Sequence, residues 1–352
     1  MEFYRRDGKS VKIEGKGWRM AKIGIIGAGS WGTAMAVMLG KRHDVTLWVY
    51  DPAQAKEMEQ YRENKQFLPG VLIEDTVHFV TDVKDAMEEA ELVITAVPSH
   101  TMRETANRMK PYYKGQRLLN ISKGLEEETL LRLSQVLCDV IPEANVAVMS
   151  GPSHAEEVGR GIPTTNVVSC LEASQAGAIQ DLVMCQEFRV YTNTDIIGVE
   201  LGGSLKNVIA LCAGILDGLG MGDNTKAALM TRGLAEITRL GCAMGADACT
   251  FAGLSGIGDL IVTCTSMHSR NRRAGILIGQ GYTLDETLAK VNMVVEGVKT
   301  ASAAHDLAHK YGVEMPICQQ AYAVLFEGKN PHDALGDLMS REKKEETAYL
   351  NG

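Results

Sequence analysis

The stretch Lys22-Ile23-Gly24-Ile25-Ile26-Gly27-Ala28-Gly29-Ser30-Trp31-Gly32-Thr33-Ala34 decides the fold of this chain. An apolar run ends at Gly27, and residues 33–39 have the composition of a helix. The glycines between them follow G-x-G-x-x-G, a pattern that indicates dinucleotide binding where a buried strand precedes it and a helix follows it. Gly27 permits the tight turn, Gly29 lets the backbone approach a pyrophosphate, and Gly32 lets the helix pack on the strand. We therefore predict a dinucleotide site at this turn.

A second predicted strand, residues 44–50, ends at Asp51. An acidic residue about twenty positions beyond the glycines is where such sites hold a ribose hydroxyl. Asp51 is also suited to cap a helix that begins near Pro52. The two roles are compatible, and the sequence leaves both open.

Composition narrows the class of protein. The length of 352 residues suits two domains, and a net charge of −8 argues against nucleic-acid binding. The eight cysteines are scattered and show no metal-ligand spacing, which indicates free thiols in a reducing compartment and no metal site. No uncharged apolar run approaches the ~18 residues of a membrane span. We expect a cytoplasmic protein without a membrane span.

Strands and helices alternate up to residue 194, and long helical patterns follow. The alternation predicts an α/β fold, with an N-terminal doubly wound Rossmann-type domain followed by an all-α C-terminal substrate domain. We expect a tail at residues 1–20 (an appended segment or an early start, without fixed structure), a dinucleotide-binding domain at 21–194 and a helical substrate domain at 195–352. In such a sheet the segments that follow Gly27, Val97, Ile121 and Met149 meet at one crevice.

Lys206 and Asp259 are the main candidates for chemistry in the helical part. If Lys206 lies on a helix, small and apolar residues surround it and no carboxylate lies one turn away. Burial lowers the pKa of a lysine toward the range useful for acid–base catalysis. The alternative is a lysine that extends from a packed helix to solvent. Asp259, among glycine and apolar residues, is either a helix cap or the partner of a buried cation.

A basic cluster, Ser269-Arg270-Asn271-Arg272-Arg273, stands out in this acidic chain. Guanidinium groups match the geometry of phosphate, so the cluster could clamp an anion. A solvated basic turn is the alternative for the cluster alone.

These motifs together resemble the soluble, nicotinamide-dependent glycerol-3-phosphate dehydrogenases, and more specifically their bacterial branch. The matching segments are residues 27–34, 96–98, 122–124, 150–155, 202–207, 217–220, 222–228, 256–260, 269–271 and 295–297. The resemblance implies an enzyme that interconverts sn-glycerol 3-phosphate and dihydroxyacetone phosphate with NAD or NADP and supplies glycerol 3-phosphate for phospholipid synthesis. Its partner would be a small phosphorylated substrate, and a homodimer is left open.

The resemblance also implies roles for individual residues. Lys206 would exchange the proton with the substrate oxygen, oriented by Asn207, Asp259 and Thr263. Substrate contacts would come from Lys123, Gly151, Ser153, Lys206, Asp259, Ser269, Arg270 and Asn271. Cofactor contacts would come from Gly27, Gly29, Ser30, Trp31, Gly32, Tyr50, Asp51, Lys123, Ala155, Arg270, Val294 and Glu296.

The pair Tyr50-Asp51 departs from many bacterial relatives and is similar to the Phe-Glu pair of the animal NAD-linked enzymes. A carboxylate there repels the 2′-phosphate of NADP and accepts from the hydroxyls of NAD, so Asp51 favours NAD. Two alternatives stay open. One is another dehydrogenase with a Rossmann and a helical domain, of the β-hydroxyacid dehydrogenase or ketopantoate reductase type; the other is a non-catalytic NAD-sensing protein.

Overall fold

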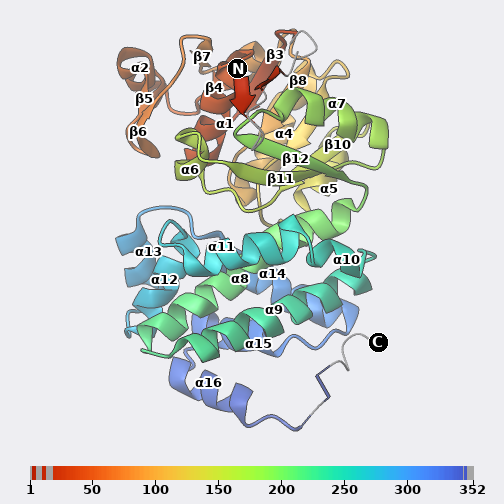
Figure 1. The fold of residues 1–352 in the computed structure, drawn as a ribbon. Helices are drawn as coiled ribbons and strands as arrows, with labels where there is room; N and C mark the ends of the chain where they lie inside the picture. Colours follow the sequence, from red (N-terminus) through yellow and green to blue (C-terminus); the bar gives the residue numbers. More distant parts are fainter. Residues whose placement is uncertain (1, 5–9, 13–18, 344, 347–352) are drawn as a thin grey trace.

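The amino-terminal half of the molecule is built on one eight-stranded sheet (Figure 1). The computed structural model describes residues 2–4, 10–12, 19–343 and 345–346. The strands of the sheet are Lys22–Ile26 (β3), Asp44–Trp48 (β4), Val77–Val80 (β7), Leu92–Thr95 (β8), Arg117–Asn120 (β9), Val146–Ser150 (β10), Thr164–Ser169 (β11) and Phe188–Asn193 (β12).

The strand order is β12-β11-β10-β9-β8-β3-β4-β7. The strands from β7 to β10 are parallel, and in chain order they follow the 3-2-1-4-5-6 arrangement of a doubly wound dinucleotide-binding sheet. β11 pairs antiparallel with β10, and β12 is parallel to β11. The predicted Rossmann-type fold class is therefore confirmed, and β11 and β12 extend the sheet beyond the strands that we predicted.

Helices cover both faces of this sheet. They are Ser30–Gly40 (α1), Pro52–Tyr61 (α2), Val83–Met87 (α3), Met102–Met109 (α4), Leu133–Val140 (α5), Ala155–Gly159 (α6) and Ala173–Val183 (α7). Side chains of the central strands alternate between two cores: Ile25 lies in the core with α1, α6 and α7, and Ile26 lies in the core with α3, α4 and α5. A short antiparallel pair, Glu63–Asn64 (β5) with Leu68–Leu72 (β6), replaces the loop expected there.

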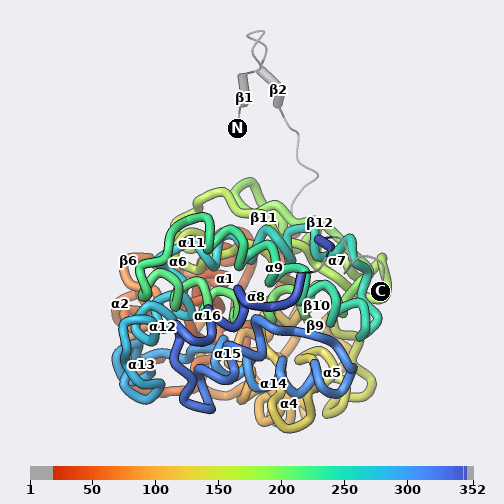
Figure 2. Tube along the Cα trace, turned by 90° about the horizontal axis from the view of Figure 1, so that it is seen from below, coloured from red at the N-terminus to blue at the C-terminus, as the bar shows by residue number. Residues whose placement is uncertain are grey.

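The carboxyl-terminal half is helical, as predicted. Its elements are Ile196–Gly218 (α8), Asp223–Ala243 (α9), Ala248–Phe251 (α10), the π-helical turn Leu254–Gly258 (η3), Asp259–Thr265 (α11), Arg270–Gly279 (α12), Leu284–Val291 (α13), Glu296–Tyr311 (α14), Pro316–Phe326 (α15) and Pro331–Met339 (α16). Seen from below, α8 lies in the middle of this half, and α9, α11, α12 and α14 pack against it (Figure 2). Most of its residues are buried.

We predicted no membrane span, whereas two helical stretches are long and apolar enough for one. They are Ile196–Gly218, which is α8, and Ala248–Thr265, which consists of the three short elements α10, η3 and α11. In the apolar window of α8, 89% of the residues are buried inside the protein. A helix that is apolar on all sides is expected at the centre of a large core. Packing against the surrounding helices therefore explains the composition of α8.

The amino-terminal tail is described only in part. Residues Glu2–Tyr4 (β1) and Ser10–Lys12 (β2) form an antiparallel pair, although we expected residues 1–20 to lack fixed structure. Residues 1, 5–9 and 13–18, on which the same expectation falls, lie outside the described residues.

Candidate active site

The glycine turn joins β3 to α1 at the carboxyl edge of the sheet. Gly27 has a φ of +116°, a conformation that favours glycine. Around Gly29, no heavy atom lies within 4 Å of the position that a Cβ would take. Gly29 is also the N-cap of α1, and no side chain caps this helix, so its first N–H groups have no side-chain partner. The turn thus offers backbone donors and room for a pyrophosphate, as a dinucleotide requires.

The predicted ribose site lies at the end of the neighbouring strand β4. Asp51 Oδ1 accepts a hydrogen bond of 2.8 Å from the backbone N–H of Ala53 and caps α2. Oδ2 of Asp51 has no hydrogen bond to another described residue, so one carboxylate oxygen is available to a ligand. The exposed ring of Tyr50 lies beside it, with the Arg108 guanidinium 5.4 Å from the ring centroid.

Asp259 joins two lysines from different halves of the molecule. Its Oδ1 accepts a hydrogen bond from Lys206 Nζ, and its Oδ2 accepts one of 2.6 Å from Lys123 Nζ. Lys206 Nζ also donates to Thr263 Oγ1 at 2.6 Å. Asp259 is 1% exposed and Lys206 is 5% exposed. Because the N-cap of α11 is Gly258, Asp259 is not a cap but the partner of two cations.

Burial sets the protonation of this cluster. It lowers the pKa of Lys206 to about 8, against the opposing effect of the nearby Asp259 carboxylate. Burial alone would raise the pKa of Asp259, but the charges of Lys123 and Lys206 outweigh it and hold that pKa below its ordinary value. Lys206 therefore has a pKa close to neutral pH, where an amine both gives and takes a proton readily.

Arg270 is a mostly buried cation at the start of α12. Burial lowers the pKa of its guanidinium, and the carboxylates of Glu296 and Glu156 only partly offset this. Among the described residues, none forms a hydrogen bond or an ion pair with Arg270. A partly buried guanidinium without a partner loses solvation, so Arg270 is poised for an anionic ligand.

Two other members of the basic cluster have structural partners, so the predicted clamp is smaller than the motif suggests. Arg272 Nε donates to Asp217 Oδ2 at 2.7 Å, and Arg272 Nη1 donates to the Thr265 carbonyl at 2.7 Å. Ser269 Oγ caps α12 by accepting from the backbone N–H of Arg272. Arg272 thus holds the loop in front of α12 and Arg273 is exposed to solvent, which leaves Arg270 as the partly buried cation available to a ligand.

Two asparagines predicted near the substrate bind one another. Asn271 Nδ2 donates to Asn207 Oδ1 at 2.9 Å, and Asn271 Oδ1 accepts 2.8 Å from the backbone N–H of Gly297. These two hydrogen bonds link α8, α12 and α14 at Asn207, the residue that follows Lys206. No hydrogen bond joins Asn207 to the Lys206 amine among the described residues, so Asn207 can orient that lysine only through the backbone of α8.

Glu296 bridges the two halves at the start of α14. Its carboxylate accepts hydrogen bonds from the backbone N–H and the Oγ of Ser99, at 3.2 and 2.6 Å. Ser99 follows β8 and was not singled out in the sequence. Only the tertiary fold brings it to Glu296, which lies 197 positions later in the chain and is, like Val294, a predicted cofactor contact.

The loop after β10 supplies the remaining candidates. Ser153 Oγ donates to the Gly151 carbonyl at 3.0 Å, and that carbonyl also accepts from Lys123 Nζ at 3.2 Å. Ala155 is the first residue of α6. His154, in the same motif but without a predicted role, is largely buried, and burial together with the Lys206 charge lowers its pKa.

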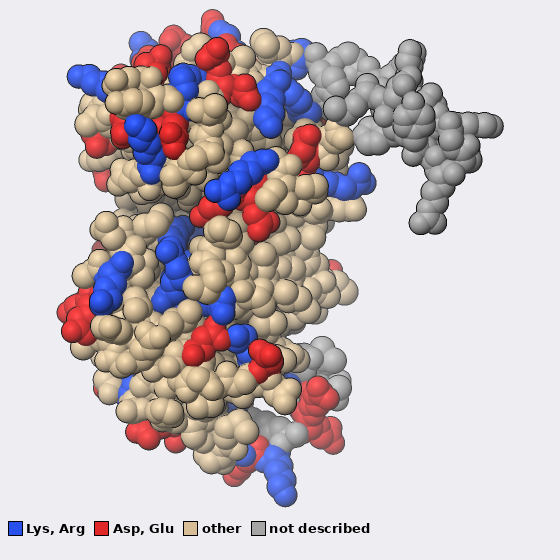
Figure 3. Space-filling model, turned by 60° about the vertical axis from the view of Figure 1, so that its left-hand side comes forward, with Lys and Arg blue, Asp and Glu red and all other residues tan. Residues whose placement is uncertain are grey.

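The loops at the ends of the strands converge as expected. Ser122 Oγ, after β9, donates to the Val97 carbonyl at 2.7 Å, and Lys123 reaches the loop after β10. Figure 3 shows that the surface is indented between the two halves and that Lys and Arg side chains lie along this waist. The site therefore combines the glycine turn of one half with the buried lysine and arginine of the other.

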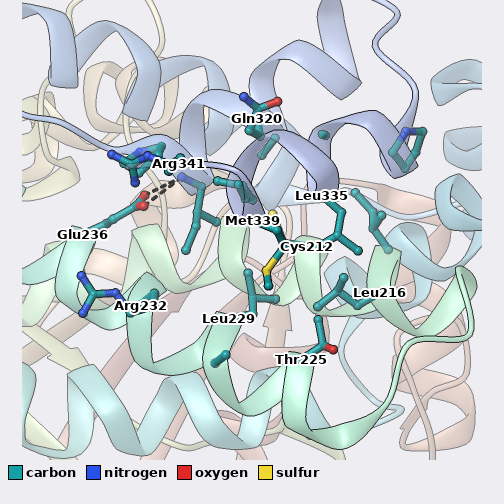
Figure 4. Close-up of a pocket in the computed structure, with 18 of the residues that line it drawn as sticks. Cys212, Leu216, Thr225, Leu229, Arg232, Glu236, Gln320, Leu335, Met339 and Arg341 are labelled. Atoms are coloured by element: carbon teal, nitrogen blue, oxygen red, sulfur yellow. Dashed lines mark hydrogen bonds between the residues drawn. The ribbon is translucent and has the colours of Figure 1, made fainter. Parts of the chain in front are cut away.

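The large apolar cavity shown in Figure 4 is a separate feature. It measures about 790 Å³ and lies among α8, α9, α15 and α16. Glu236 lines it and accepts 2.8 Å from the backbone N–H of Ile317; burial raises the pKa of Glu236 to about 7. None of the predicted site residues lines this cavity.

A Rossmann-type sheet with an open glycine turn, closed by a helical half that carries a buried lysine, defines a two-domain nicotinamide-linked dehydrogenase. The family model described as NAD-dependent glycerol-3-phosphate dehydrogenase N-terminus matches residues 22–176, and the C-terminus model matches residues 195–336. The chain therefore belongs to the NAD-dependent glycerol-3-phosphate dehydrogenase family.

Similar proteins agree with this assignment. The chain is 56% identical over 329 residues to a glycerol-3-phosphate dehydrogenase [NAD(P)+] of Desulfitobacterium hafniense, covering 93% of both chains. A crystal structure of glycerol-3-phosphate dehydrogenase from Coxiella burnetii superposes with a TM-score of 0.88 at 37% identity, covering 92% of this chain and 99% of that one. A ketopantoate reductase from Ralstonia eutropha, of the alternative class, has a TM-score of 0.58 at 17% identity over 89% of this chain and 99% of that one, and shares the fold alone.

Proposed function

We propose that this protein is an oxidoreductase that interconverts sn-glycerol 3-phosphate and dihydroxyacetone phosphate, with NAD or NADP as the hydride carrier. The observation that carries the proposal is the buried Lys206–Asp259–Lys123 cluster, together with the unpaired Arg270 on α12, the helix that Asn271 and Asn207 join to α8. A proton-exchanging amine and a free guanidinium on two joined helices suit a substrate with a carbonyl and a phosphate.

Lys206 acts in this proposal as the acid and base for the substrate oxygen at C2. During reduction of the ketone its ammonium donates a proton, and during oxidation of the alcohol its amine accepts one. Asp259 and Thr263 hold the Nζ in place. Asn207 fixes the helix behind it through Asn271. Because the cluster is buried, the proton passes directly between the amine and the substrate, and the amine regains or releases it to solvent between turnovers.

Arg270 and Lys123 bind the substrate in this proposal. The free guanidinium of Arg270 pairs with the phosphate, and Lys123 lies between Asp259 and the Gly151 carbonyl, within reach of a substrate oxygen. The further contacts that we propose are Ser153, Ser269, Asn271 and the backbone of Gly151. Their proximity to Lys123, α12 and Asn207 supports the assignment.

The glycine turn is the proposed nucleotide site. When bound, the nicotinamide cofactor accepts or supplies the hydride at C2 of the substrate. The open space at Gly29 and the uncapped start of α1, at Ser30 and Trp31, suit its pyrophosphate. Asp51, with one free carboxylate oxygen beside Tyr50, supports a preference for NAD. The remaining proposed contacts are Ala155, Val294 and Glu296.

We further propose that residues 21–194 form the dinucleotide-binding domain and residues 195–352 the substrate domain. The end of β12 at Asn193 and the start of α8 at Ile196 support this boundary. Homodimer formation, a cytoplasmic location and a supply of glycerol 3-phosphate to phospholipid synthesis complete the proposal. Eight free cysteines among the described residues support the reducing location.

An absorbance assay tests the function. Purified protein is mixed with dihydroxyacetone phosphate and either NADH or NADPH, and oxidation of the nicotinamide is followed. We expect turnover with the phosphorylated ketone and little with unphosphorylated dihydroxyacetone. Binding of NADH without any turnover would instead identify a nucleotide sensor, and turnover of 2-ketopantoate would identify the other dehydrogenase class.

A further inference from the structure

A buried ion pair joins the two halves of the molecule away from the reacting groups. Glu200 of α8 accepts a hydrogen bond of 2.5 Å from Arg132 Nη1. It also accepts a hydrogen bond of 2.9 Å from the backbone N–H of Ser134 and one of 2.5 Å from Ser134 Oγ. We call Arg132, Ser134 and Glu200 the clasp. Arg132 is 9% exposed and Glu200 is 8% exposed, so all three bonds are shielded from solvent.

The clasp connects two elements that both lead to the site. Arg132 is the N-cap of α5, which precedes β10 and the loop at Gly151. Glu200 lies six residues before Lys206 on α8, which is about 9 Å along a helix axis. One turn beyond Glu200, Ser204 Oγ accepts 2.9 Å from the backbone N–H of Gly124, the residue after Lys123. This face of α8 is thus bonded to the loop that carries Lys123.

Apolar packing surrounds the clasp. Val148, Val167, Ile196 and Val199 form a buried cluster between β10, β11 and the first turns of α8. Such contacts are non-directional, so they specify the position of the helix less sharply than hydrogen bonds do. A buried carboxylate with three directional donors has a single favourable position, because losing any donor leaves it poorly compensated.

We propose that Glu200 is a positioning residue for the proton transfer: through Arg132 and Ser134 it fixes the rotation and axial position of α8, and thereby the place of Lys206 Nζ over the nicotinamide half. This inference rests on the proposed function. It assigns the clasp a role in catalysis beyond holding the halves together, since a displacement of about 1 Å at the reacting groups can lower the rate about 100-fold.

The test uses Glu200→Gln, which keeps the size of the side chain and removes its charge. We expect kcat for reduction of dihydroxyacetone phosphate to fall at least ~10-fold, while KM for NADH changes less than about twofold, because the glycine turn is untouched. A second readout is the isotope effect on kcat with NADH deuterated at the transferred hydrogen. We expect it to rise, because a misplaced Lys206 slows the chemical step relative to product release.

A matched control comes from an exposed ion pair between the same two halves. Lys299 Nζ of α14 donates to Glu127 Oε2 at 3.3 Å, with both side chains partly exposed. Glu127→Gln removes one charge from this pair and should leave kcat and the isotope effect unchanged. Ser134→Ala removes the hydroxyl that donates to Glu200 and accepts from Arg132, while the Arg132–Glu200 pair stays. Ser134→Thr restores the hydroxyl. These milder variants provide the test if Glu200→Gln does not fold.

The outcomes separate positioning from stability. A lower kcat per folded molecule in Glu200→Gln, or in Ser134→Ala with recovery in Ser134→Thr, supports the inference, and a larger isotope effect assigns the loss to the chemical step. An unchanged kcat or a smaller isotope effect overturns it, as does a lower kcat that only follows the folded fraction measured by circular dichroism. Wild-type protein without turnover overturns the proposed function as well, whereas active wild type with unaffected variants overturns only the role of the clasp.

Discussion

The glycine turn and the Asp259 cluster are built in different ways, although both face the waist of the molecule. The turn uses backbone N–H groups from one short segment, with space left by the absence of side chains at Gly29. The cluster uses side chains from three distant segments, which carry Lys123, Lys206 and Asp259. The first region depends on local backbone geometry, whereas the second exists only when the whole chain is folded. Substitutions in the two regions should therefore change the kinetics and the stability of the protein in different ways.

The largest effect is expected at Lys206. Lys206→Ala removes the proton donor and should lower kcat at least ~100-fold, the usual contribution of an acid–base group, while KM for NADH stays near normal. Steady-state kinetics measure both values. Lys290→Ala, at an exposed lysine of the same half, is the control. A near-normal kcat in Lys206→Ala would remove this residue from the mechanism.

Arg270→Ala should mainly affect binding of the phosphorylated substrate. The loss of a charge-assisted hydrogen bond, about 1.5–3 kcal/mol, predicts a KM for dihydroxyacetone phosphate raised ~10- to ~100-fold. Arg273→Ala changes an exposed arginine of the same helix and should have little effect. If Arg270→Ala also weakened turnover of an unphosphorylated ketone to the same degree, the phosphate role would be wrong.

The pH dependence follows from the pKa of Lys206, about 8. Reduction needs the protonated amine, so kcat/KM, which reports the pKa values of the free enzyme, should be level well below pH 8 and fall about tenfold per pH unit well above it. Oxidation of glycerol 3-phosphate needs the neutral amine and should show the opposite trend. Rates of reduction and oxidation measured between about pH 6 and about pH 10, roughly two units on either side of the pKa, test both trends. A reduction rate that stays level across pH 8 would contradict the assignment.

Two glycine variants separate binding from folding at the turn. Gly29→Ala adds a methyl group where no protein atom is near, so the melting temperature should hold while KM for NADH rises about tenfold, the cost of one or two lost hydrogen bonds. Gly32→Ala places its Cβ against the Gly27 carbonyl and should lower the melting temperature. Equal melting temperatures for the two variants would show that the close packing of Gly32 on the Gly27 carbonyl does not contribute to stability.

The smallest effect is expected at Asp51. Asp51→Asn keeps the cap of α2 and removes a charge worth roughly 1 kcal/mol to a 2′-phosphate in water, so the NADPH-to-NADH ratio of kcat/KM should rise roughly fivefold. Glu59→Gln, at an exposed residue of the same helix, serves as the comparison. An unchanged ratio would mean that Asp51 does not select the cofactor.

The sequence predicted the sheet well because its signals are local. The strand from Lys22, the glycine turn and the helix after it are neighbours in the chain, so spacing alone defines them. The small residues around Lys206 indicated burial, and the structure places that lysine in the core of the helical half. The long helices of the second half were likewise predicted from their apolar periodicity.

Contacts between segments far apart in the chain could not be predicted from local sequence signals. Ser99 meets Glu296 across 197 positions, and nothing near either residue indicates the other. Arg272 looked equivalent to Arg270 in the basic cluster, but Asp217, 55 positions earlier, binds Arg272 and not Arg270. The N-cap of α5 likewise depends on a distant residue, because Glu200, 68 positions later, binds the Arg132 side chain.

The carboxylate of Asp259, divided between lysines of separate halves, also has a consequence for assembly. Until the halves dock, Lys123 lacks this counter-ion and the pair of Lys206 with Asp259 lacks its second cation. In the proposed mechanism, a folding intermediate with only one folded half lacks this three-charge cluster and is inactive, so activity requires both halves to be folded and docked.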